Sequence, residues 1–91
     1  MIDTLGLLAE AVHLAAELGH EVREEPLGDS PGGACIVAGT RRILVNADLP
    51  ASDRLAVIVA ALAADPRTAE EPMSRALADR LARAAAAGPR G

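Results

Sequence analysis

The feature of this sequence that most constrains its fold is an uninterrupted apolar run in the middle of the chain. Residues 55–64 read Leu-Ala-Val-Ile-Val-Ala-Ala-Leu-Ala-Ala, ten positions without a polar side-chain atom. The run is too short to cross a bilayer, and its alanines do not favour a strand. A surface helix would carry a polar stripe, so we expect a helix that is covered on all sides. Ser52 is its expected N-cap, and Asp65 and Pro66 mark its expected end.

The composition limits both the core and the class of partner. The chain has 91 residues, 51% of them hydrophobic, and it contains no Phe, Trp or Tyr. Leu, Val, Ile and Ala must therefore fill a small core, and self-association is a common way to stabilise such a domain. The net charge of −4 and the lack of aromatic stacking residues argue against a nucleic-acid partner. No apolar segment is long enough for a membrane-spanning helix, so we expect no membrane partner.

The single cysteine, Cys35, cannot form an intramolecular disulfide, which suits a reducing compartment. The N-terminal segment lacks a basic region and a cleavage site of the kind that a secretory signal carries. We therefore expect a cytoplasmic protein.

Periodicity and turn residues divide the first half of the chain. Apolar residues at three- and four-residue steps predict a helix over residues 4–18, with Gly19 at its end. The charged segment 20–27 predicts an exposed edge strand, and the glycines and prolines of residues 28–33 predict a loop.

The second half predicts a hairpin and two helices. Two short apolar runs, 34–38 and 42–45, are typical of hairpin strands joined by a tight turn at Gly39-Thr40. A last helix is expected from Pro72 to about Ala87. The prediction is one α+β domain over residues 1–87, with a three-stranded antiparallel sheet packed against helices in the order α-β-β-β-α-α. Residues 88–91 are expected to form a short tail.

Three segments carry a family resemblance. Residues 16–19 end the first helix as Ala-Glu-Leu-Gly, residues 21–27 are extended, and residues 42–50 read Arg-Ile-Leu-Val-Asn-Ala-Asp-Leu-Pro before a capped helix. In this order the chain resembles, over about residues 9–65, the front half of the ImmA/IrrE-type metallopeptidase domain. In that family a strand of this kind leads through a Leu-Pro connector into the helix that bears His-Glu-x-x-His.

The residues that would carry the family's chemistry are absent. Matched onto this sequence, the two zinc-ligand histidines fall at Ala60 and Ala64, and the glutamate base falls at Ala61. Alanine can neither bind zinc nor take a proton from water. The resemblance therefore implies a degenerate scaffold without peptidase activity, and we expect no enzyme.

Other candidate sites offer little convergent chemistry. His13, His20 and Cys35 could bind a metal together with Glu17 or Glu24, but they form no close ligand pairs. His13 and Glu17 lie one helical turn apart, which is typical of a solvated helix face. Cys35 lies in an apolar run, where a free cysteine usually packs as a small hydrophobe. We expect no cofactor, and a small-molecule or metal-binding protein stays the alternative function.

Charged and turn residues also have simple structural interpretations. The loop over residues 28–33 lacks the Lys-Ser/Thr that follows a phosphate-binding loop. Arg41 and Arg42, near the hairpin tip, could contact an anion or simply keep an edge soluble. The cluster of Glu21, Glu24 and Glu25 is expected to protect an edge strand, and Asn46 and Asp48 to turn the chain.

The apolar helix is the feature that points to a partner. Its alanines permit another backbone to approach closely, and either the C-terminal helix or a second subunit could cover it. We therefore expect a non-catalytic interaction or self-associating module, as a homodimer or with a protein partner. The candidate interface residues are Leu55, Ile58, Val59, Leu62, Met73, Leu77 and Leu81.

Overall fold

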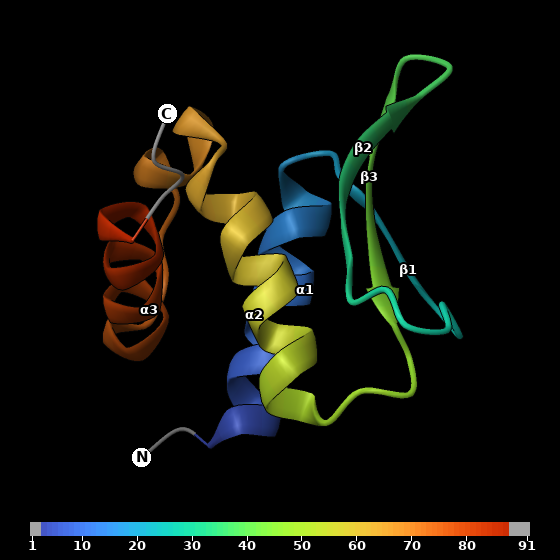
Figure 1. Cartoon of the computed structure of the whole chain (residues 1–91). Helices are drawn as coiled ribbons and strands as arrows, with labels where there is room; N and C mark the ends of the chain where they lie inside the picture. The colour runs from blue at the N-terminus through green and yellow to red at the C-terminus, as the bar shows by residue number, and fades with distance from the viewer. Residues whose placement is uncertain (1–2, 88–91) are drawn as a thin grey trace.

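The computed structural model describes residues 3–87, so the expected tail at residues 88–91 lies outside the described part. The elements follow one another as α1 (Thr4–Glu17), β1 (Glu21–Glu25), β2 (Gly32–Val37), β3 (Thr40–Asn46), α2 (Ala51–Ala63), the 3₁₀ helix η1 (Pro66–Glu70) and α3 (Arg75–Ala86). Figure 1 shows α1 and α2 lying between the sheet and α3. The α+β fold and its element order confirm the sequence prediction.

The sheet has a mixed topology, so the predicted purely antiparallel sheet is wrong. Its strand order is β1-β3-β2, with β2 antiparallel to β3 and β1 parallel to β3. The loop over residues 26–31 crosses the end of β3 and places β1 and β2 on opposite edges. Because β2 reverses the chain and the hairpin reverses it again, β3 runs in the direction of β1.

The side chain of Asn46, at the end of β3, holds this crossing loop. Its Oδ1 accepts hydrogen bonds from the backbone N–H groups of Leu27 (3.3 Å) and Asp48 (3.0 Å). Its Nδ2 donates to the carbonyl oxygens of Gly28 (3.0 Å) and Ser30 (2.9 Å). Asn46 is only 2% exposed, so these bonds replace the solvation of a buried amide.

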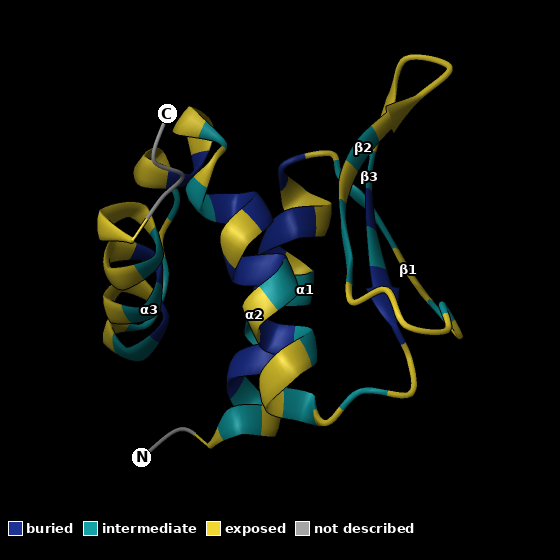
Figure 2. Ribbon diagram, viewed as in Figure 1, coloured by how far each residue is buried: buried dark blue, intermediate teal, exposed yellow. Residues whose placement is uncertain are grey.

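The core lies between the helices and one face of the sheet. Side chains alternate between the two faces of a strand, and Ile43 and Val45 of the central strand β3 are fully buried on the face that packs against α2. Figure 2 shows the buried residues gathered along the facing sides of the helices. The core consists of Leu7, Leu8, Ala11, Leu14, Ala15, Leu18, Ile43, Val45, Leu55, Ile58, Val59, Ala61, Leu62, Leu77 and Leu81.

Several element ends differ from the sequence prediction. Helix α2 begins at Ala51 after Pro50, which has no side-chain cap, so the predicted cap at Ser52 is wrong. Proline fixes a backbone angle that can precede a helix, and Asp53 then lies in the first turn, near the positive end of the helix dipole. The hairpin turn consists of Ala38 and Gly39, both with positive φ, and Thr40 already belongs to β3.

The C-terminal helix also begins later than the proline signal predicts. Ser74 is its N-cap and accepts a hydrogen bond from the Leu77 N–H at 3.1 Å, whereas Pro72 lies outside the helix. The 3₁₀ helix before it has no counterpart in the prediction. Asp65 caps this helix by accepting from the Arg67 N–H at 2.9 Å, with Pro66 as its first residue.

Helix α2 is not covered on all sides by the described residues, which corrects the expectation for the apolar run. Helices α1 and α3 and the sheet pack around it from different directions. The remaining side leaves Asp53, Ala56, Ala60 and Ala64 exposed. None of the helices formed by residues 3–87 has the length and apolar character needed to span a membrane.

Candidate functional site

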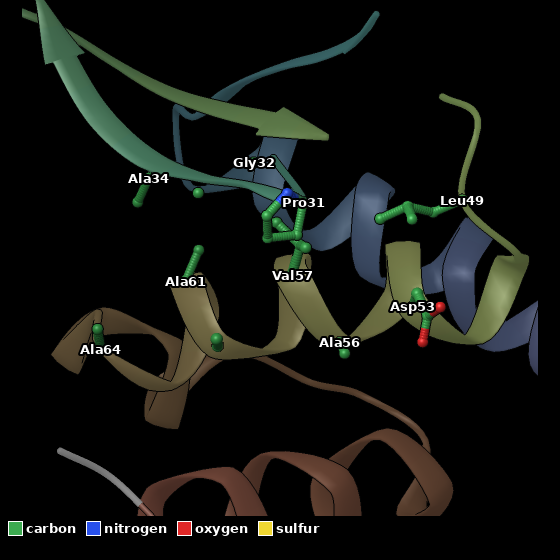
Figure 3. Close-up of a pocket in the computed structure, with 11 residues that line it drawn as sticks. Pro31, Gly32, Ala34, Leu49, Asp53, Ala56, Val57, Ala61 and Ala64 are labelled. Atoms are coloured by element: carbon green, nitrogen blue, oxygen red, sulfur yellow. The ribbon is translucent and has the colours of Figure 1, made fainter. Parts of the chain in front are cut away.

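A groove runs between the exposed side of α2 and the strand β2, and we call it the β2–α2 groove (Figure 3). Its first part encloses about 580 Å³ and is lined mainly by glycine and alanine. This first part begins near the start of α2, where it is lined by Leu49, Asp53 and Val57 on one side and by Pro31 and Gly32 on the other. Small side chains on both walls leave room for another polypeptide chain.

The second part of the groove continues past Ala34 and Ala64 toward the hairpin and encloses about 420 Å³. Its end is lined by Ile36, Arg41 and Arg67. Helix α2 and strand β2 therefore run in the same direction along the groove, from an acidic end at Asp53 to a basic end at the two arginines.

One wall of the groove is the free edge of β2. The Asn46 N–H donates to the Pro31 carbonyl at 3.0 Å. This bond identifies which residues of β2 direct their backbone groups toward β3 and which direct them away, and we call this alternation the phase of the edge. Odd-numbered residues of β2 then bond to β3, whereas Ala34 and Ile36 turn their N–H and C=O groups away from it. Both residues line the groove, and their outward groups find no strand to pair with among residues 3–87.

The two edges of the sheet differ in how they are protected. Strand β1 carries Glu21, Arg23, Glu24 and Glu25, and Arg23 pairs with its two neighbouring glutamates at 3.4 and 3.1 Å. Charges of this kind discourage pairing with another chain. Strand β2 reads Gly-Gly-Ala-Cys-Ile-Val without a charge, and its Ile36 side chain is 71% exposed. The unprotected edge is the one that borders the groove.

A buried polar cluster closes the basic end of the groove. The Asp65 carboxylate accepts from Arg67 at 2.6 Å and contacts His20 Nε2 at 3.0 Å, and the side chains of His20 and Asp65 are each 8% exposed. The Arg67 guanidinium holds the pKa of the Asp65 carboxyl well below its usual range, although burial acts in the opposite direction. Arg41 lies farther away, at 3.8 Å from the same carboxylate oxygen. Two half-exposed guanidinium groups thus share one carboxylate.

The structure does not bring the candidate metal ligands together. His13 is 78% exposed and contacts Glu17 at 3.4 Å on the surface of α1, whereas His20 belongs to the Asp65 cluster. Cys35 is in register with Arg42, whose guanidinium contacts Glu21 at 3.3 Å, so its side chain lies on the sheet face away from the helices. In the described part of the chain, no three His, Cys, Asp or Glu residues are placed to hold a metal ion.

The remaining charged candidates form surface ion pairs. Glu24 contacts Arg54 of α2 at 3.0 Å, which ties β1 to the start of that helix. A third hollow of about 610 Å³ lies between η1 and α3 and is lined mainly by apolar side chains such as Leu62 and Met73. None of the residues that line it belongs to a strand, so it offers no pairing edge.

Most candidate interface residues lie in the chain's own core. Leu55, Ile58, Leu62 and Leu77 are fully buried, Val59 and Leu81 are 6% and 9% exposed, and Met73 packs partly buried against them. The exposed side of α2 carries Asp53 and the alanines Ala56, Ala60 and Ala64 instead. Ala60 and Ala64 line the groove, and Ala61 beside them is 8% exposed.

Sequence reasoning missed the edge of β2 as part of a site. The signal was the small, uncharged run of residues 32–37 beside a strongly charged first strand. Without the strand order, however, that run could equally have been the central strand of the sheet.

The comparisons with known proteins assign no family. No protein-family model matches the chain, and no curated protein and no solved structure is significantly similar to it.

Proposed function

We propose that this chain is a non-catalytic interaction module that accepts an extended polypeptide strand in the β2–α2 groove. The observation that carries the proposal is the uncharged free edge of β2, which borders a groove lined by glycine and alanine. An added strand would pair with the outward N–H and C=O groups of Ala34 and Ile36. Main-chain pairing of this kind supplies affinity, and flanking side chains supply specificity.

The charges of the groove support a strand of defined direction. Asp53 lies at one end, and Arg41 and Arg67 lie at the other. An occupant that carries opposite charges at its two ends would be held in one orientation, because the reversed orientation would bring like charges together.

A scaffold without a catalytic motif is consistent with this proposal. Ala60 and Ala64 lie on the groove side of α2, at the positions where the resemblance to the ImmA/IrrE-type domain would place zinc ligands. Neither residue can bind a metal or move a proton, so we propose a binding groove without hydrolysis. The single cysteine supports a cytoplasmic location for such a module, and the net charge of −4 supports a protein partner over a nucleic acid.

Selection of random peptides displayed on phage tests the proposal. The immobilised bait is wild-type protein, and the Ala34→Pro variant, which lacks the outward N–H of Ala34, serves for counter-selection. Ala34→Ser keeps that N–H and is the matched control. A proline is tolerated on an edge strand where its missing N–H would face away from the sheet.

We expect enriched peptides that bind wild type and Ala34→Ser equally and bind Ala34→Pro at least about tenfold more weakly. Peptides that bind all three proteins equally would contradict the proposal, and so would a selection that enriches no peptide on monomeric wild-type protein, whose β2 edge is free.

A further inference from the structure

We propose that the strand that occupies the β2–α2 groove is β2 of a second copy of this chain, related to the first by a two-fold axis. This inference rests on the proposed function, because it names the occupant of the same groove. Three observations support it. The two ends of the groove carry opposite charges, alternate residues of β2 turn their backbone groups outward, and the exposed side of α2 has small side chains.

The ends of the groove complement each other under a two-fold rotation. Because α2 and β2 run in the same direction, an antiparallel second copy would place its acidic end against the basic end of the first. Asp53 is exposed and forms no ion pair with the described residues. Arg41 has only the distant contact with a carboxylate that Arg67 already holds. Asp53 of one copy would therefore supply the carboxylate that Arg41 of the other copy lacks.

The phase of the free edge allows a symmetric pairing. The residues that face outward are Gly32, Ala34 and Ile36, with Ala34 at the centre. A two-fold axis at Ala34 would pair this residue with its own copy and pair Gly32 with Ile36. The exposed Ile36 side chain would then lie near Leu49 and Val57 of the other copy, which are the apolar residues at that end.

The helices fit the same arrangement. Helix α2 packs against both β2 and β3 of its own sheet. With strands spaced about 4.8 Å apart, a continuous sheet through two adjacent β2 strands would place the two α2 helices about 10 Å apart. Helices in contact lie about 8–10 Å apart, and short side chains permit the lower end of this range. Ala56, Ala60 and Ala64 provide such a surface on the exposed side of α2.

The oligomeric state of the full chain tests the inference. Sedimentation equilibrium on wild-type protein should give a dimer with a dissociation constant below about 100 µM. Ala34→Pro should be monomeric at that concentration, and Ala34→Ser should remain dimeric. Circular dichroism of each variant checks that the fold is retained.

A charge exchange provides a test that does not depend on the proline variant. Asp53→Arg and Arg41→Asp should each weaken the dimer by about tenfold, because like charges then meet. The double variant should recover most of the wild-type affinity, since the ion pair is restored with its polarity reversed. Recovery is specific to the proposed arrangement, in which these two residues meet across the axis.

Three results would overturn the inference: a wild-type monomer at all concentrations, a dimer that survives Ala34→Pro with its fold intact, or a double variant as weak as the single ones. The proposed function is judged separately. A monomer that still binds selected peptides through the Ala34 N–H would remove the second copy as occupant and leave the strand-accepting groove. A dimer that is indifferent to Ala34→Pro, together with failed peptide selection, would remove both.

Discussion

At the scale of single residues, Asn46 is a buried polar side chain with a clear structural role, because its one amide makes four hydrogen bonds. Those bonds fix the loop that carries the chain from one edge of the sheet to the other. We expect Asn46→Ala to lower the free energy of unfolding by about 2–3 kcal/mol, since it leaves buried carbonyl and N–H groups without partners. Urea unfolding measures this loss.

Asp48→Ala is the matched control for Asn46. The Asp48 side chain is exposed, so its removal should change stability by no more than about 0.5 kcal/mol. Equal effects at the two positions would show that the Asn46 amide does not hold the loop.

Ala38, in the hairpin turn, is a residue whose replacement should stabilise the protein. Its φ of 51° lies in the left-handed region, where an alanine side chain is strained. The two-residue turn with positive φ at both positions favours Asn-Gly, and Gly39 already provides the second residue. We expect Ala38→Asn to raise the free energy of unfolding by about 0.5–1 kcal/mol. A thermal or urea unfolding curve at or below the wild-type stability would contradict this turn geometry.

At the scale of elements, α3 is attached to the body of the protein through a contact between Glu10 and Ser74. The Glu10 carboxylate of α1 accepts from the Ser74 backbone N–H at 2.7 Å and from the Ser74 hydroxyl at 2.6 Å. The same hydroxyl oxygen accepts from the Leu77 N–H and so caps α3. One carboxylate therefore orients the cap of a helix 64 residues further along the chain.

We expect Glu10→Ala to lower the free energy of unfolding by about 1–3 kcal/mol, because two charge-assisted hydrogen bonds are lost. Hydrogen exchange should speed up first in residues 75–86. Glu17→Ala, on the exposed side of the same helix, should change stability by no more than about 0.5 kcal/mol. Uniform loss of protection across the whole chain would argue against a local attachment of α3.

The elements that the sequence predicts correctly are those set by local pattern. The periodicity of residues 4–18, the charges of residues 20–27 and the two short apolar runs predict α1, the edge strand β1 and the β2–β3 hairpin. The parallel pairing of β1 with β3 depends instead on a loop held by Asn46, between 16 and 19 residues away in sequence. The start of α3 depends on Glu10, which is equally non-local. No local signal predicts contacts of this kind.

At the scale of the whole molecule, the Asp65 cluster joins the turn before β1, the end of α2 and η1. The pKa of Asp65 is lowered in the folded state, mainly by Arg67, so the folded protein favours the charged carboxylate more strongly than the unfolded chain does. This contribution to stability is fully present above the carboxyl's usual pKa of about 4 and is lost as the pH falls through the lowered value.

The melting temperature of wild type should therefore exceed that of Asp65→Asn by the largest margin near about pH 6, and the margin should shrink toward about pH 2. A constant difference for Asp65→Asn over this range would contradict the lowered pKa.

The sequence identified α2 as the unusual element, but it could not assign its faces. Every side chain in residues 55–64 is apolar, so no polar stripe marks which side faces the core. The packing of α1 and α3 decides this by burying the larger side chains, including Leu55, Ile58 and Leu62, and leaving the alanines outside. The groove therefore arises from tertiary packing, and it borders a strand whose edge position was also not predictable.

A dimer formed through that groove would couple stability to protein concentration, because only the folded state associates. Raising the wild-type concentration a hundredfold, across the dissociation constant, should raise the melting temperature by about 5 °C or more. Ala34→Pro should melt at one temperature throughout, since its edge cannot pair, and Ala34→Ser should follow wild type. Differential scanning calorimetry over this range measures the effect directly. If wild type and Ala34→Pro show the same slope, association does not use the edge of β2, and the exposed alanines of α2 need another explanation.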